Sequence, residues 1–347
     1  MKICILRRAC RLSEIAGEYG LSEKSLMELN GLERSGLLPR GMSLVLPGRD
    51  AAPKRKKELY CLWNKAAVQC PERLSFAAAE FELGDDAQQD TAFLDFALGR
   101  EALPVYSLCS QGDLPQTRAL ICDREQGRAF LEALTEKISA MGYGALEVNI
   151  PCLLPFDRAQ FTDFAGLAAE AAHKRGLWLI CTVPLYTEET RYQRHCAAYD
   201  AGALGETADR LIVDTGSLMG MEEMSRGLEY MCSFVPAGRL LAAVREGARL
   251  YRDGTVEHLS ARSAQNLAIT AGAEISRRGE GETAQFRFTD KAKSRCTVEY
   301  GDSLWAEKIC ALVEHFSLAG LARKSGQDLS CGTERLFDGY FAVHGLL

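Results

Sequence analysis

Short apolar segments alternate with longer amphipathic ones over residues 58–347, and this alternation constrains the fold more than any other feature. Each apolar segment has the length of a buried strand, and each intervening segment has apolar residues at helical spacing. Strands that alternate with helices form a parallel sheet. Eight such strands predict a closed (β/α)8 barrel, a TIM barrel of the α/β class. The predicted strands are residues 59–63, 76–81, 103–108, 145–150, 177–183, 211–214, 240–244 and 320–323.

The interval between the seventh and the eighth predicted strand is too long for a single crossover. Within it, residues 263–273 have helical spacing, whereas residues 284–289 and 297–300 have the composition of strands. We therefore predict a small α+β insertion at about residues 256–302. The helices of the barrel itself are predicted near residues 87–99, 125–141, 158–175, 196–206, 222–234, 303–317 and 332–343.

Residues 1–48 are predicted to be a separate unit with the order strand, helix, helix, strand. Apolar residues recur at helical spacing in residues 12–19 and 22–30, and residues 43–47 form a short final strand. Residues 49–57 are polar and basic, which predicts a solvated linker between this unit and the barrel.

The first unit resembles a LysM module in Leu12-Ser-Glu-Ile-Ala16, Leu29-Asn30 and Arg40-Gly-Met-Ser-Leu-Val-Leu-Pro47. The resemblance implies that it holds N-acetylglucosamine chains, such as those of peptidoglycan, between two loops. The first loop usually reads Pro-Gly-Asp-Thr in the family, whereas Arg8-Ala-Cys-Arg11 stands there in this chain. The glycine that permits a tight turn is absent. Two interpretations therefore remain: the module binds sugar, or it retains the fold only for packing or for a partner.

The fourth predicted strand carries polar residues on one face. Side chains alternate along a strand, so Glu147 and Asn149 share a face with Ala145 and Pro151, while the even-numbered residues between them are apolar. Such a strand is typical of the inside of a parallel barrel near its mouth.

This strand resembles the fourth strand of the family-18 glycoside hydrolases, whose pattern is Asp-Gly-x-Asn/Asp-x-Asp-x-Glu. Aligned without gaps, the pattern places its second polar position at Glu147, its next carboxylate at Asn149 and its catalytic Glu at Pro151. The segment from Leu153 to Arg158 resembles the branch that carries LysM modules and acts on spore peptidoglycan. The resemblance implies a chitinase-like barrel.

This chain lacks the catalytic groups that the family's reaction requires. In the family, one Glu protonates the glycosidic oxygen, and a neighbouring Asp supports the acetamido group of the substrate, which attacks the anomeric carbon. Pro151 has no proton to give, and Asn149 carries no charge. Glu147 is the remaining carboxylate of the strand, but it precedes Pro151 by roughly 13 Å of strand rise. The sequence therefore predicts that no catalytic set is intact.

Other strands depart from the family in the same way. In the sixth strand Thr215 is retained, but Gly216 stands where the family has a tyrosine. In the eighth strand Lys324 lies near the place of the tryptophan that supports the sugar ring.

Charged residues follow the seventh and eighth predicted strands, and they are predicted to crowd the barrel mouth above Glu147. Two interpretations are a pocket for an anionic or polar ligand and an internal network of salt bridges that fills a disused cavity; a new catalytic role is a third. These residues are Arg245, Glu246, Arg323 and Lys324. The candidate binding residues are thus Glu147, Asn149, Thr215, Arg245, Glu246 and Lys324.

Composition excludes several classes of partner. The net charge of −6 argues against nucleic acid. No apolar run is long enough for a membrane span, and the first residues do not form a signal peptide, so synthesis in the cytoplasm is expected. The thirteen cysteines are scattered without zinc spacing, so neither a metal site nor a cofactor is expected.

The sequence therefore favours a non-catalytic, glycosidase-like protein that binds peptidoglycan or has a structural role. The resemblance alone suggests deposition on the spore surface and contact with spore-envelope proteins. The alternatives are an active hydrolase of N-acetylglucosamine-containing glycan with a relocated acid, and an enzyme of different specificity that uses Glu147 and the basic residues.

Overall fold

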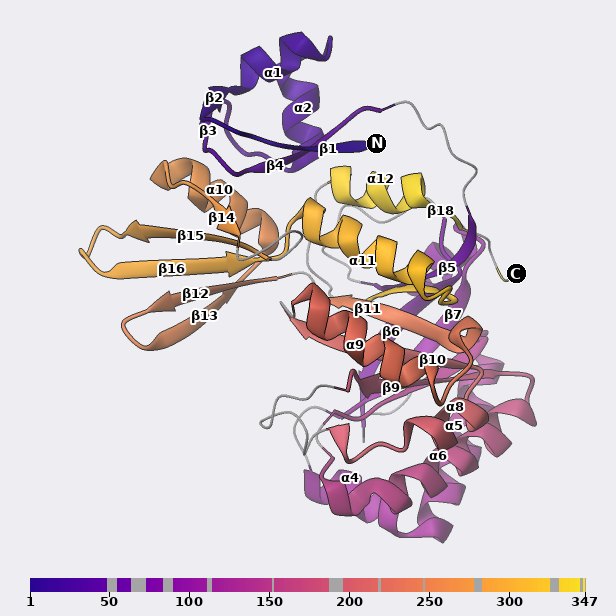
Figure 1. The fold of residues 1–347 in the computed structure, drawn as a ribbon. Coiled ribbons are helices and arrows are strands. Elements are labelled where there is room, and N and C mark those ends of the chain that lie inside the picture. Colours follow the sequence, from indigo (N-terminus) through magenta and orange to yellow (C-terminus); the bar gives the residue numbers. More distant parts are fainter. Residues whose placement is uncertain are drawn as a thin grey trace.

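Eight parallel strands close into a barrel, as the alternation of strands and helices predicts (Figure 1). The last strand pairs with the first where Gly320 faces Glu58. A Cβ at Gly320 would lie 1.8 Å from the carbonyl oxygen of Glu58, so the close approach of the two strands requires a glycine. The barrel strands are β5 (Arg55–Leu62), β6 (Phe76–Glu82), β7 (Leu103–Cys109), β8 (Ala145–Asn149), β9 (Trp178–Pro184), β10 (Arg210–Ser217), β11 (Leu240–Arg245) and β17 (Gly320–Arg323).

The structure, a computed structural model, describes most of the chain. Among the residues that it describes, no helix is long and apolar enough to cross a membrane. The described residues are 1–48, 55–63, 73–83, 90–110, 114–151, 153–186, 196–217, 220–245, 247–277, 283–324, 331–343 and 346.

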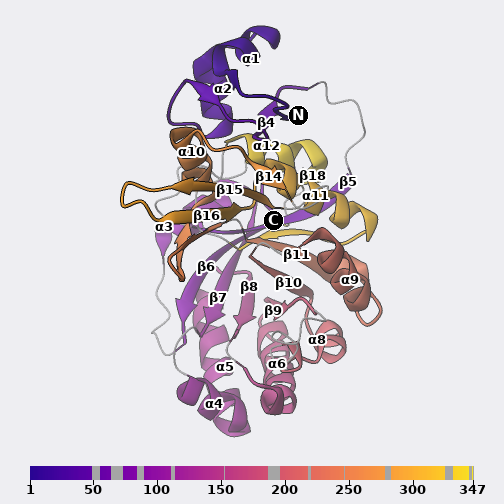
Figure 2. The same cartoon turned by 60° about the vertical axis from the view of Figure 1, so that its left-hand side comes forward.

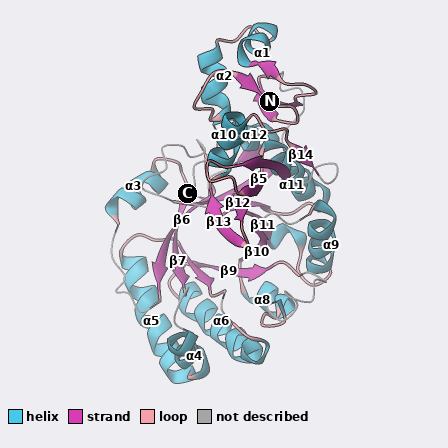
Figure 3. Cartoon of the chain, turned by 90° about the vertical axis from the view of Figure 1, so that its left-hand side faces the viewer, coloured by secondary structure: helices cyan, strands magenta, loops and turns pink. Residues whose placement is uncertain are grey.

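Helices surround the ring of strands, as Figure 3 shows. Aspartates cap four of them: the side chains of Asp90, Asp123, Asp200 and Asp302 accept hydrogen bonds from backbone N–H groups in the first turn. The helices are α3 (Thr91–Leu98), α4 (Leu114–Cys122), α5 (Arg124–Ala140), α6 (Arg158–His173), α8 (Ala201–Thr207), α9 (Met221–Cys232), α11 (Ser303–His315) and α12 (Cys331–Tyr340), with 3-10 turns at Pro155–Asp157 and Ala237–Arg239.

Two apolar cores lie on the two faces of the barrel wall. Tyr60, Phe76 and Ile180 belong to the core inside the barrel. Leu146 and Val148 belong to the larger core between strands and helices. Neighbouring residues of a strand thus enter different cores, as side-chain alternation requires.

The end of the chain differs from the prediction. Residues 332–343 are predicted to be helical, but α12 ends at Tyr340 and β18 (Phe341–Val343) follows. The new strand pairs in parallel with the start of β5, and it buries Phe341 and Val343 on alternate positions. The alternation of buried residues is that of a strand, so the pairing with β5 replaces the last turn of helix.

The first unit has the predicted order of elements. Asn30 joins its second helix to its last strand, because its amide donates to the carbonyl oxygen of Val45 at 3.0 Å and accepts from the N–H of Val45 at 2.7 Å. Short strands also pair between the two loops. The elements are β1 (Lys2–Ile5), β2 (Cys10–Arg11), α1 (Leu12–Glu18), α2 (Glu23–Asn30), β3 (Leu37–Leu38) and β4 (Ser43–Leu46).

The insertion between β11 and β17 is a five-stranded sheet with one helix. Its first strand starts at Ala248, before the predicted bound of about 256, and it alternates buried Ala248 and Leu250 with more exposed residues. The elements are β12 (Ala248–Arg252), β13 (Thr255–Leu259), α10 (Ala261–Ala271), β14 (Ser276–Arg277), β15 (Ala284–Thr289) and β16 (Arg295–Tyr300).

The first unit packs on the insertion and on α12, as Figure 2 shows. Leu12 and Leu26 of the unit share one apolar core with Phe286 and Tyr300 of the insertion. The N–H of Ile275 also donates to the carbonyl oxygen of Arg40 at 2.9 Å. The unit is therefore held against the barrel by a common core as well as by the chain between them.

Candidate functional site

The side chain of Glu147 lies inside the barrel and is fully buried. One of its oxygens, Oε1, pairs with the ammonium of Lys324 and accepts a hydrogen bond from the Thr182 hydroxyl at 2.5 Å. The other oxygen, Oε2, accepts a hydrogen bond from the Tyr60 hydroxyl. Strands β8, β9 and β5 contribute Glu147, Thr182 and Tyr60, and Lys324 directly follows β17, so the cluster ties together four parts of the wall.

Lys324 occupies the space beneath the barrel mouth. It is 5% exposed, and its ammonium lies 5.2 Å from the centre of the Tyr60 ring. A cation over an aromatic face is attracted to it, so Tyr60 stabilises the charge of Lys324 as well as that of Glu147.

The surroundings of Glu147 keep it ionised. Burial alone would raise the pKa of the carboxyl. The charge of Lys324 and the hydrogen bonds from Lys324, Thr182 and Tyr60 outweigh burial, so the pKa lies below its ordinary value. Burial and the charge of Glu147 raise the pKa of Tyr60 well above its usual range. A carboxylate held in this way has no proton to donate near neutral pH.

The positions after Glu147 offer no carboxyl group either. Asn149 ends β8 at 6% exposure, and Pro151 lies in the exposed turn that follows it. Asp157 is buried beyond this turn, but it is bound by Arg118 at 3.0 Å and accepts from the N–H of Leu154 at 2.8 Å. Its two contacts fix the loop before α6.

The other predicted site residues divide between the two faces of the wall. The hydroxyl of Thr215 donates to the carbonyl oxygen of Ala243 at 2.7 Å, so it braces β10 against β11. Arg323, predicted at the mouth, is buried with its Nη1 3.8 Å from the Sγ of Cys61, which belongs to the outer core. Adjacent residues of an extended chain point to opposite faces, and Lys324, the residue after β17, takes the inner one. The side chain of Arg245 and all of Glu246 lie outside the described residues.

Sequence reasoning did not identify Tyr60 and Thr182 as members of the site. Both occupy inward positions of their strands, since Tyr60 shares the inner core with Ile180, two residues before Thr182. The alternation of side chains, applied to every strand and not to β8 alone, would have placed both residues inside the barrel.

Three further carboxylates lie at inward positions near the ends of strands, namely Glu80 and Glu82 of β6 and Asp214 of β10. Glu80 of β6 is exposed, and its charge contributes to the raised pKa of Tyr60. Asp214 of β10 is half-buried. Glu80 and Asp214 follow residues of the inner core at a spacing of two, namely Ala78 and Ile212, and Glu82 follows Glu80 at the same spacing. The alternation of side chains therefore assigns the three carboxylates to the inner side of the wall.

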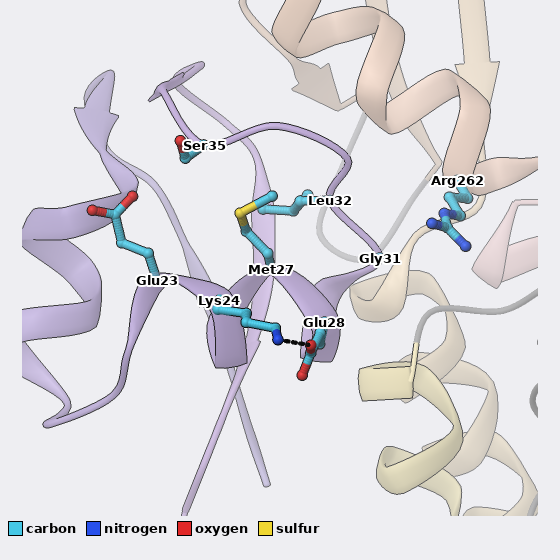
Figure 4. Close-up of a pocket in the computed structure, with 8 residues that line it drawn as sticks. All are labelled: Glu23, Lys24, Met27, Glu28, Gly31, Leu32, Ser35 and Arg262. Atoms are coloured by element: carbon cyan, nitrogen blue, oxygen red, sulfur yellow. Dashed lines mark ion pairs between the residues drawn. The ribbon is translucent and has the colours of Figure 1, made fainter.

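The first loop of the LysM-like unit carries three arginines. Arg11 is the N-cap residue of α1, a position where Ser, Thr, Asp or Asn is usual, and its side chain makes no capping hydrogen bond. Arg7 and Arg8 are exposed in the same loop. A shallow hollow lies elsewhere on the unit, over Met27 and Leu32 of α2 and its following loop, with Arg262 of the insertion at its edge (Figure 4).

No metal-binding cluster is present among the described residues: no three His, Cys, Asp or Glu side chains are placed to hold an ion. No disulfide joins the cysteine side chains that the structure describes.

The first unit matches a known domain family, in agreement with its order of strands and helices. Residues 12–47 match the family model for the LysM domain. This segment is a LysM domain. The cortical fragment-lytic enzyme of Bacillus subtilis is 23% identical over 225 residues, which are 59% of this chain and 51% of that protein. The chain thus spans about half the length of this curated relative.

Solved structures share the architecture of most or nearly all of the chain. The spore cortex-lytic enzyme SleL of Bacillus megaterium superposes with a TM-score of 0.74 at 16% identity, over 99% of this chain and 87% of that one. A chitinase of Chromobacterium violaceum superposes with a TM-score of 0.71 at 19% identity, over 82% of this chain and 98% of that one. The predicted chitinase-like TIM barrel with its LysM domain is therefore confirmed as a fold.

Proposed function

We propose that the protein is a non-catalytic member of this fold that binds peptidoglycan, or another N-acetylglucosamine-containing glycan, through its LysM domain. The buried ion pair between Lys324 and Glu147 carries the proposal. A lysine fills the interior beneath the mouth, and it neutralises the one carboxylate of β8. The barrel then serves as a scaffold that presents the LysM domain.

The turn after β8 supports the same proposal. A glycosidase needs a protonated carboxyl beside the leaving oxygen and a second group that stabilises the developing charge. Pro151 and Asn149 stand at the two positions where the resemblance places those groups. Loss of a general acid alone costs about 10²–10⁴ in rate.

The relatives point to the glycan with which the proposal is tested. Two of the three are named as a cortical fragment-lytic enzyme and a spore cortex-lytic enzyme, so cortex peptidoglycan is the glycan we infer. Spore-surface deposition and contacts with spore-envelope proteins are part of the same proposal.

Binding is tested by sedimentation of the full chain with insoluble cortex peptidoglycan. Leu37 of β3 is 60% exposed beside the LysM loops, whereas Leu98 of α3 is 59% exposed on the barrel. Leu37→Asp is expected to lower the bound fraction, and the matched change Leu98→Asp is expected to leave it unchanged. Absence of saturable binding by the unaltered protein would contradict the proposal.

One observation favours the alternative of an active hydrolase. Glu80 and Asp214 are carboxylates at inward positions of the mouth, where an acid relocated from β8 would have to lie. In that case the protein releases fragments from cortex peptidoglycan, and Glu80→Gln or Asp214→Asn abolishes the release.

A further inference from the structure

A second pocket lies where the LysM domain meets the insertion. Its volume is about 440 Å³, which is within the usual range of roughly 300–1,000 Å³ for small-ligand sites. The pocket exists because β14 packs beside the turn before β4. It is lined by Ile5, Leu6, Arg7, Arg40, Gly41, Ile275 and Arg277.

The backbone around this pocket is closely fitted. Gly41 has a φ of +83°, and a Cβ there would lie 1.9 Å from the carbonyl oxygen of Ile275. The N–H of Gly41 donates to the carbonyl oxygen of Leu6 at 2.8 Å, and the N–H of Ile275 donates to that of Arg40. These bonds fix the positions from which the arginine side chains extend.

Three guanidinium groups line the pocket, and their nearby counter-charges are few. Arg277 pairs with Asp302, and both side chains are largely buried. Asp302 is also bound by the hydroxyl of Ser43 at 2.5 Å, so its acceptor oxygens are engaged away from the other two arginines.

The two remaining arginines keep their charge available. Arg40 lies 4.0 Å from Glu274, but both side chains are mostly exposed, and an exposed pair at this distance contributes little. Arg7 is exposed, and no acidic side chain among the described residues forms an ion pair with it. The pocket therefore carries a net positive charge.

The hollow of Figure 4 provides a contrast on the same domain. Lys24 and Glu28 form an ion pair on its rim at 3.9 Å, and Glu23 adds a further negative charge. Charges of both signs there do not select an anion. Of these two pockets, the junction pocket is the one with an excess of guanidinium groups.

We propose that the junction pocket binds a carboxylate group of the ligand, and that the protein therefore prefers glycan strands that carry peptides over unsubstituted strands. Guanidinium groups bind carboxylates through paired, charge-assisted hydrogen bonds. Peptidoglycan differs from a plain N-acetylglucosamine polymer in the acidic peptides on its sugars. This inference rests on the proposed glycan binding and specifies which glycan is bound.

Calorimetry with soluble ligands tests the inference on the full chain. The probes are a muropeptide with free carboxylates, the same muropeptide with its carboxylates amidated, and a peptide-free N-acetylglucosamine oligosaccharide. The variants are Arg7→Gln and Arg40→Gln. Arg34→Gln is the matched control, because Arg34 is exposed in the same domain and does not line the pocket. Arg277 is left unchanged because its buried ion pair supports the fold.

The free muropeptide is expected to bind about tenfold more tightly than the amidated one, as a charged hydrogen bond implies. Arg7→Gln and Arg40→Gln should each remove most of this difference, and Arg34→Gln should retain it. Equal affinity for the free and the amidated muropeptide would overturn the inference. Binding of either muropeptide would still support the proposed function. Binding of none of the three probes overturns both.

Discussion

Lys324 and Glu147 are separated by 177 residues in the chain, yet they form an ion pair inside the barrel with 1% and 0% of their side chains exposed. Two buried charges are costly to remove from water, and they are tolerated when each satisfies the other and further hydrogen bonds complete the set. Tyr60 and Thr182 complete it here. In this protein the barrel centre is organised around a satisfied pair of charges.

Removal of one partner should therefore destabilise the fold strongly. Lys324→Met leaves the Glu147 carboxylate buried without its counter-charge, and we expect a loss of about 3–5 kcal/mol in the free energy of unfolding. Urea denaturation measures the loss. The double variant Lys324→Met with Glu147→Leu should regain most of it, because no buried charge remains. Lys174→Met, at an exposed lysine, is the control. A small effect of Lys324→Met would show that the pair is not buried as described.

The contribution of Glu147 to the free energy of unfolding should depend on pH in opposite directions in the unaltered protein and in Lys324→Met. The pKa of Glu147 in the folded protein lies below its ordinary value of 4.5. Its stabilising contribution is thus complete above that pH and is lost as pH falls through the folded-state pKa. In Lys324→Met, unopposed burial should raise this pKa, so the contribution is lost as pH rises instead. The difference in unfolding free energy between the two proteins should shrink from pH 7 towards pH 4. A difference independent of pH would contradict the assignment.

The junction between the LysM domain and the insertion should depend on Gly41. Gly41→Ala introduces a positive-φ strain and a collision with the carbonyl oxygen of Ile275. Gly20→Ala is the matched control, because Gly20 also has a positive φ but nothing within 4 Å of its Cβ position. We expect about 1 kcal/mol of destabilisation for Gly20→Ala and clearly more for Gly41→Ala. In Gly41→Ala, amide hydrogen exchange of β14 should also accelerate. Equal effects of the two changes would indicate that the junction is loose.

Alternation within a single strand predicted one member of the buried cluster. It placed Glu147 and Asn149 inside the barrel, and it would have separated Arg323 from Lys324, since adjacent residues of a strand cannot share a face. The pairing of Glu147 with Lys324 depends instead on the relative positions of β8 and β17 along the axis of the closed barrel. That relationship joins residues distant in sequence, and no local pattern encodes it. The short strand β18 was missed for the same reason, because its pairing with β5 overrides a helical pattern.

The same limit applies to the junction pocket. The sequence shows that arginines occupy the first LysM loop, and Arg8 and Arg11 were recognised there. It does not show that Arg7, Arg40 and Arg277 line one pocket, because β14 lies more than 200 residues further along the chain than the loops it packs against.

Turnover of spore cortex peptidoglycan by the full chain tests the central claim most directly, with released fragments identified by mass spectrometry and the bound fraction measured in the same sample. We predict saturable binding and no fragments beyond those of a protein-free control, for the unaltered protein and for Glu80→Gln and Asp214→Asn alike. Fragments that accumulate with time and disappear in either variant would show that the barrel is an active hydrolase with a relocated acid.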